Sequence, residues 1–152
     1  MLPGNGYGGD DTFSIPEHPP VVSSLDLPDA LYRTADPGYF SALQIPLIQG
    51  RFFTEQDRLD RANKVIISRQ LARQYFPSDN PMGKHLHVPS RGNKDYEVVG
   101  VVGDTLWQVG VRTLRAIYFP LFSGESNMGD SMLMLAVRTA SDPPALSVPV
   151  QK

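Results

Sequence analysis

The chain contains no cysteine among its 152 residues. That absence excludes disulfide bonds, zinc sites built on cysteine and a cysteine nucleophile. It leaves the redox compartment open, because an oxidising compartment allows a chain without cysteine and a reducing one does not require it.

Long hydrophobic runs are also absent. No apolar stretch approaches the ~20 residues that a membrane-spanning helix needs, and residues 1–30 have neither the basic region nor the apolar core of a signal peptide. From these absences we expect a soluble chain that is either cytoplasmic or a piece of a larger protein.

The overall composition is that of one folded domain, with room for two lobes. The hydrophobic content is 41%, as in ordinary globular domains. Fourteen prolines and thirteen glycines favour loops and strands over long helices.

Charge is distributed unevenly along the chain. Residues 1–50 have a net charge of −5, residues 51–94 of +5 and residues 95–152 of −2. A basic segment is one mark of nucleic-acid binding, but acidic residues are interspersed here and the whole chain is slightly acidic. We interpret the segment as a solvated surface of mixed charge and expect no nucleic-acid partner.

The strongest strand signal is the segment from Tyr96 to Asp104, which contains four valines and two glycines. A nearly continuous β-branched run is typical of a strand covered on both faces. Gly100 and Gly103 indicate a bulge or the close approach of another backbone. We predict that this is the central strand of a sheet, ending in a turn at Gly103-Asp104.

Helices are predicted where capping residues precede an apolar face. Ser68 is typical of an N-cap, and the helix after it is stopped by Pro77. Asp36-Pro37 predicts another helix start, with the aspartate as cap. The segment Thr54 to Asp57 predicts a further short capped turn.

Further strands are expected around the central one. Residues 85–88 and 95–103 flank a polar turn and are predicted to pair as a hairpin. The remaining strands are expected at residues 31–35, 63–67, 116–119 and 132–138.

Two histidines, His85 and His87, are two residues apart in a predicted strand, so their side chains share one face. Such a pair can bind a metal, but no third ligand has matching spacing, and His18 lies in a proline-rich connector. We interpret both as polar residues on a solvent-facing strand and predict no metal site.

Ser68 and Asp104 stand at the ends of predicted strands, where catalytic residues often occur. Ser68 lacks the glycines of a nucleophile elbow, because Ile66 and Gln70 occupy those positions. Asp104 has no partner carboxylate in a local motif and is assigned to a turn. We predict no catalytic and no cofactor-binding residue, and keep a hydrolase using Asp104 or His85 as a third hypothesis.

The loop from residue 104 to residue 115 contains the only tryptophan, Trp107, with Val109 and Val111 close to it in sequence. These side chains either form an exposed apolar surface for a partner or ligand or fold back over the sheet. The first arrangement would suit a freestanding small-molecule or peptide binding module, which is the alternative function.

Several blocks of the sequence together resemble one family. They are Asp36-Pro37-Gly38-Tyr39-Phe40, Ile45 to Phe53 with Asp57, Val65 to Ser68, Leu71 to Pro77, Pro81-Met82-Gly83-Lys84, residues 96–104 and Ile117 to Pro120. In this order and spacing they resemble the MacB-type periplasmic core domain of FtsX-like ABC transporter permeases, and most of all the acidobacterial permease group. The resemblance covers about residues 10–146.

The resemblance implies a fold. The family domain is α+β, with a mixed sheet, short helices and two lobes. A porter-like lobe would comprise residues 1–35 and the return strands within residues 105–152, truncated at the end, and an inserted lobe would comprise residues 36–104.

The resemblance also implies a role. It is that of a non-catalytic domain on the periplasmic side of the inner membrane, which transmits ATP-driven conformational change and docks partners. The implied partners are the permease's own membrane helices, its ATP-binding subunit or domain, a periplasmic adaptor protein and a second copy of the chain. No cofactor is implied, and ATP would bind to another domain or chain, because this sequence has no P-loop.

Overall fold

The structure is a computed structural model that describes residues 10–17, 27–105 and 115–121. Within these ranges the elements follow one another as β1 (Asp10–Thr12), β2 (Asp29–Ala35), α1 (Tyr39–Ala42), β3 (Leu47–Gly50), α2 (Glu55–Leu59), β4 (Lys64–Ser68), α3 (Arg69–Tyr75), β5 (His85–Val88), β6 (Lys94–Val102) and β7 (Ala116–Pro120).

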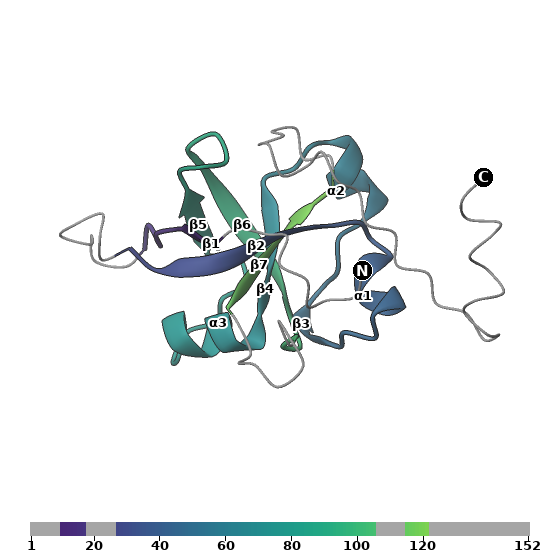
Figure 1. The fold of residues 1–152 in the computed structure, drawn as a ribbon, viewed down its shortest axis with the longest axis horizontal. Coiled ribbons are helices and arrows are strands. Elements are labelled where there is room, and N and C mark those ends of the chain that lie inside the picture. Colours follow the sequence, from purple (N-terminus) through teal and green to yellow (C-terminus); the bar gives the residue numbers. More distant parts are fainter. Residues whose placement is uncertain (1–9, 18–26, 106–114, 122–152) are drawn as a thin grey trace, which may run out of the picture.

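The strands form one mixed sheet in the order β1-β2-β7-β4-β6-β3, with β5 paired to β6 beside that path (Figure 1). Two neighbouring pairs are parallel, β2 with β7 and β4 with β6. The other pairs are antiparallel, including the predicted hairpin of β5 and β6. The mixed sheet with short helices confirms the fold class, and the division into two lobes stays a prediction.

Strand β6 is the most connected strand, as its valine-rich sequence predicted. It pairs with β4, β3 and β5, and its four valines are all buried. The predicted close approach occurs at Gly100, where a Cβ atom would overlap the carbonyl oxygen of Arg51. The pairing of β4 with β6 also shifts register next to Gly100, between Val65 and Ile66, so this glycine combines both predicted roles.

Buried side chains form two clusters, because successive residues of a strand point to opposite faces of the sheet. In β4, Val65 and Ile67 belong to the first cluster and Ile66 to the second. Leu71 of α3 joins the first cluster, and Phe40 of α1 joins the second. Each fully buried side chain of this size contributes roughly 1.5–3 kcal/mol, so both faces of the sheet support the fold.

The short helices begin mostly where capping residues predicted. Thr54 and Asp57 form a capping box at the start of α2. Helix α1 differs from the prediction. It begins at Tyr39 with Gly38 as its N-cap, and no side chain caps it. The carbonyl of Asp36 accepts the Tyr39 N–H at 3.2 Å, so a backbone turn takes the place of the predicted aspartate cap.

The strand expected at residues 132–138 lies outside the described residues. In the part that is described, no helix is both long enough and apolar enough to cross a lipid bilayer.

Candidate functional site

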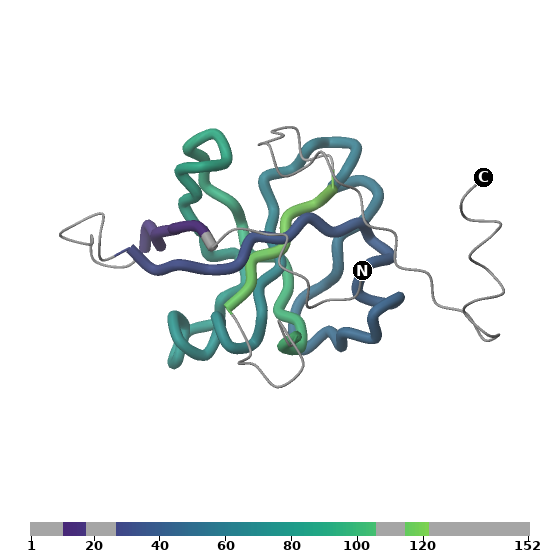
Figure 2. The backbone as a smooth tube through the Cα atoms, in the orientation of Figure 1, coloured from purple at the N-terminus to yellow at the C-terminus, as the bar shows by residue number. Residues whose placement is uncertain are grey.

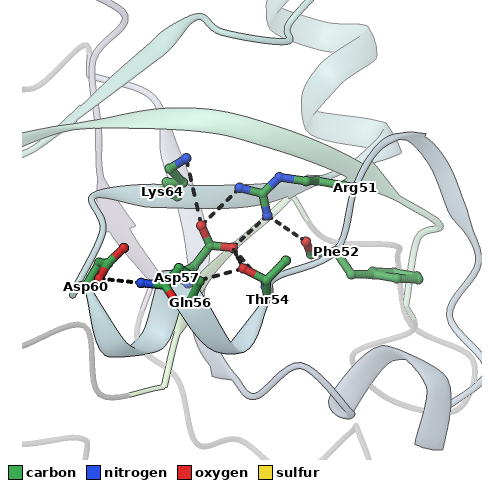
Figure 3. A network of polar contacts seen from close by, with 7 residues as sticks. All are labelled: Arg51, Phe52, Thr54, Gln56, Asp57, Asp60 and Lys64. Carbon is green, nitrogen blue, oxygen red and sulfur yellow. Dashed lines mark hydrogen bonds and ion pairs between the residues drawn. The ribbon is translucent and has the colours of Figure 1, made fainter.

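Within the described part of the chain, a dense polar network surrounds the carboxylate of Asp57, which is only 5% exposed (Figure 3). Arg51 donates two hydrogen bonds to it, from Nη1 to Oδ2 at 2.6 Å and from Nη2 to Oδ1 at 3.0 Å. The backbone N–H and the hydroxyl of Thr54 both donate to Oδ2 at 2.8 Å. Lys64 of β4 places Nζ 3.8 Å from Oδ1. We call Arg51, Thr54, Asp57 and Lys64 the Asp57 clamp.

The clamp fixes the charge of its carboxylate. The hydrogen bond from Arg51 is the largest cause that holds the pKa of Asp57 well below its usual value of 3.8, against the opposing effect of burial, and the Thr54 donors add to it. The same contact raises the pKa of Arg51. A carboxylate that stays ionised and accepts four hydrogen bonds is a poor proton acceptor. The clamp joins Arg51, which follows β3, to α2 and β4.

Sequence reasoning found half of this clamp. The segment Thr54 to Asp57 was predicted as a short capped turn, and the structure shows that these two residues form a capping box. Arg51 was missed, because it precedes the helix and its partner lies six residues further on. A basic residue shortly before a capping box that contains an aspartate is the signal that would have found the pair.

Ser68 and Asp104 both hold the first turn of α3. The Ser68 hydroxyl accepts the N–H of Leu71 at 3.4 Å and that of Ala116 at 3.0 Å. The Asp104 carboxylate accepts the Gln70 N–H at 2.7 Å and a hydrogen bond from Arg69 at 3.3 Å. Ser68 therefore acts as the predicted cap, and Asp104 anchors the helix where only a turn was expected.

His85 and His87 share a face of β5, as predicted from their spacing, but each has its own acidic neighbour. Nδ1 of His85 lies 3.3 Å from Glu17, and Nδ1 of His87 lies 2.7 Å from Asp95. Nε2 of His87 is 3.2 Å from the side-chain oxygen of Asn93. Within residues 10–17, 27–105 and 115–121, no group of three histidine, aspartate or glutamate residues could hold a metal ion.

Arg115, just before β7, connects three parts of the chain. Its guanidinium donates to Asp29 of β2 at 2.8 Å and to the hydroxyl of Tyr75 in α3 at 3.3 Å. Its carbonyl accepts the N–H of Leu31 at 2.8 Å. We call Arg115, Asp29 and Tyr75 the Arg115 junction, and sequence analysis gave no sign of it.

A small apolar surface lies at the edge strand β3, where Leu47 is 37% and Ile48 is 47% exposed. Register shifts between Leu47 and Gln49, and an irregular edge of this kind disfavours pairing with a further strand. The predicted partner surface at Trp107, Val109 and Val111 lies outside the described residues, so it stays a prediction.

Comparisons with known proteins agree with this fold. Solved structures with a similar fold include the periplasmic region of MacB from Actinobacillus actinomycetemcomitans, with a TM-score of 0.57 at 20% identity, covering 76% of this chain and 45% of that one. A domain of a putative permease protein from Porphyromonas gingivalis has a TM-score of 0.59 at 16% identity, covering 95% of this chain and 64% of that one.

Sequence relatives point to the same group. The macrolide export ATP-binding/permease protein MacB of Marinobacter nauticus is 35% identical over 63 residues, which are 41% of this chain and 9% of that protein. The chain thus spans only a small part of the relative that it matches. A family model, the MacB-like periplasmic core domain, matches residues 15–151. The chain therefore belongs to the family of MacB-like periplasmic core domains.

Proposed function

We propose that this chain is the extracytoplasmic domain of an ABC transporter permease, on the periplasmic side of the inner membrane. It transmits ATP-driven conformational change and docks partners, and it catalyses no reaction itself. Family membership supports the setting, since the matched relative is named as a combined ATP-binding and permease protein. The ATP-binding part and the membrane helices are then partners of this domain, and an adaptor protein or a second copy are further ones.

One observation carries the mechanical part of the proposal. Strands β2 and β7, which precede and follow residues 36–104, lie side by side and are parallel over five register pairs (Figure 2). Strand β7 also pairs with β4 inside that stretch. Strands β2 and β7 are hydrogen-bonded to each other, and β7 is also bonded to β4. A displacement of either strand therefore moves the whole sheet.

The side-chain contacts are consistent with a domain that is not catalytic. Each of three candidate residues holds elements together: Ser68 accepts an N–H of β7, Asp57 binds Arg51 and Lys64, and Asp104 accepts an N–H of α3. A nucleophile needs a base within hydrogen-bond reach, and the contacts of Ser68 described above are to backbone N–H groups.

Two lobes are part of the same proposal. Residues 1–35 and 105–152 would form a porter-like lobe and residues 36–104 an inserted lobe. In this division the Arg115 junction would lie where the two parts meet, since Arg115 and Asp29 belong to the first and Tyr75 to the second. We expect this junction to pass motion between them.

The native reading frame on both sides of the segment tests the setting. We expect one apolar stretch of about 20 residues upstream and three downstream, each long enough to span the bilayer. A frame with no such stretch on either side would remove the transport role.

Coupling is tested in membrane vesicles that contain the full permease. The double variant Asp29→Ala/Arg115→Ala is expected to hydrolyse ATP at nearly the normal rate while transport falls several-fold. Arg73→Ala, which changes an exposed arginine on α3, is the matched control and should change neither rate. Equal transport by both variants would exclude the Arg115 junction as a coupling element.

A further inference from the structure

The N-terminal segment closes the sheet into a ring. We call residues 10–17 the strap. Its strand β1 pairs with β2 over three register pairs, from Asp10↔Leu31 to Thr12↔Asp29. Two residues later, Ser14 forms a bridge with His87 of β5, through Ser14 N–H to the His87 carbonyl at 3.0 Å and the reverse bond at 2.8 Å. Pairing therefore runs from the strap through β2, β7, β4, β6 and β5 and back to the strap (Figure 1).

The strap also contributes to the first buried cluster. Phe13 is fully buried and Ile15 is 8% exposed. The ring of Phe13 meets that of Tyr75 in α3 edge-on, with centroids 5.3 Å apart. Because Phe13 and Ile15 alternate with Ser14, the apolar side chains face the cluster while Ser14 makes the backbone bridge.

The contact between the strap and β5 is the thinnest connection in this ring. It has one bridge, whereas β4 and β7, the next thinnest pair, share two register pairs. Those two pairs involve residues that are at most 1% exposed. The strap's other link to β5, between Glu17 and His85, involves side chains that are 32% and 46% exposed, and water competes for exposed contacts of this kind.

We propose that the strap is detachable, and that the sheet opens at the Ser14–His87 bridge while the other strands of the ring stay paired. Opening would expose the side chains of Phe13 and Ile15 and the outer edge of β5 to solvent. Only one backbone bridge and one exposed side-chain link join the strap to β5, so this contact can open without global unfolding. The inference rests on the geometry of this chain alone, so its test does not depend on the proposed function.

Hydrogen exchange of the full chain, resolved to single amides, tests the inference. We expect the amides of Ser14 and His87 to exchange at least about tenfold faster than that of Ile67 in β4, because the strap opens more often than the sheet. Exchange of all three amides at one common rate would overturn the inference, since the strap would then open only with the whole domain.

A reversible lock provides the second arm. The variant Ser14→Cys/His87→Cys places two cysteines at directly opposed positions, in a chain that has no others. When the pair is oxidised, exchange of the amides at positions 14 and 87, which form the bridge, is expected to slow towards the rate of Ile67, and reduction should restore it. An oxidised pair that leaves the rates at positions 14 and 87 unchanged would contradict a detachable strap.

Glu17→Gln provides a milder change with a matched control. It weakens only the exposed link to His85, so exchange at Ser14 and His87 should become a few times faster while Ile67 is unaffected. Glu55→Gln, which removes an exposed ion pair with Arg58 on α2, should leave all three rates unchanged. Equal effects of the two substitutions would count against the strap contact as the opening point.

Discussion

At the scale of single residues, Asp57 is the polar side chain whose role is best defined. It is buried, ionised and bonded to groups before the helix, within its cap and on β4. An amide at this position keeps one acceptor oxygen but replaces the other by an NH2 donor, so some of the Arg51 and Thr54 donors lose their acceptor. A donor or acceptor left without its partner costs more than the bond itself contributes when it is made.

We therefore expect Asp57→Asn to lower the free energy of unfolding by about 1–2 kcal/mol at neutral pH. Denaturant unfolding followed by circular dichroism would measure it. Asp60→Asn is the matched control, because Asp60 is exposed and bonds only the Gln56 side chain through its carboxylate. Its effect should stay within roughly 0.5 kcal/mol, and an equal loss in both variants would exclude a special role for the clamp.

The pH dependence of stability follows from the same residue. The folded-state pKa of Asp57 lies below its usual 3.8, so its contribution is present above that value and is lost as the pH falls towards the folded-state pKa. The stability difference between the natural chain and Asp57→Asn should be constant from neutral pH to about pH 5 and shrink below it. Denaturant unfolding at several pH values would show this, and a difference that grows in acid would contradict it.

At the scale of elements, the packing of β6 against its neighbours depends on one position that has no side chain. Gly100 faces the carbonyl of Arg51 and the side chain of Ile66, and a Cβ atom there would meet backbone that cannot easily move. The same glycine marks the register shift between β4 and β6. Close approach of β3, β4 and β6 therefore depends on this position.

Gly100→Ala is expected to destabilise the domain by about 2–3 kcal/mol through overpacking. Gly38→Ala is the matched control, because its Cβ would meet only an ordinary contact at 3.4 Å and its backbone is right-handed helical. That substitution should change stability by less than roughly 0.5 kcal/mol. Thermal unfolding of the two variants would distinguish their effects on stability. A small loss of stability in Gly100→Ala would mean that β3 can move away.

At the scale of the whole molecule, the sheet separates two buried clusters. Phe40 and Tyr118 lie in one cluster with ring centroids 5.1 Å apart. Phe119, the next residue along β7, belongs to the other cluster. Energetic coupling between residues should follow these faces rather than nearness in sequence.

Double-mutant cycles would test this separation. Phe40→Leu combined with Tyr118→Leu should show a coupling of about 0.5–1.5 kcal/mol, as contacting aromatic pairs do. Phe40→Leu combined with Phe119→Leu should be additive within roughly 0.5 kcal/mol. Equal coupling in both cycles, measured by denaturant unfolding, would mean that the sheet does not isolate its two faces.

The sequence by itself determined the elements whose signals are local. The valines of β6, the capping residues Ser68 and Thr54, and the polar turn between β5 and β6 each act within a few residues, so their pattern can be read directly. The family could also be read from blocks of sequence, and the family match confirms it.

Only the tertiary structure decided which distant groups meet. The Asp104 carboxylate binds an N–H 34 positions away, and Glu17 binds one 68 positions away. Hydrophobic periodicity says which face of an element is buried, but not which polar group from another segment lies opposite its end. The order of the strands, which local sequence does not specify, therefore decides three features. They are the anchor on α3, the Arg115 junction and the closure of the sheet by the strap.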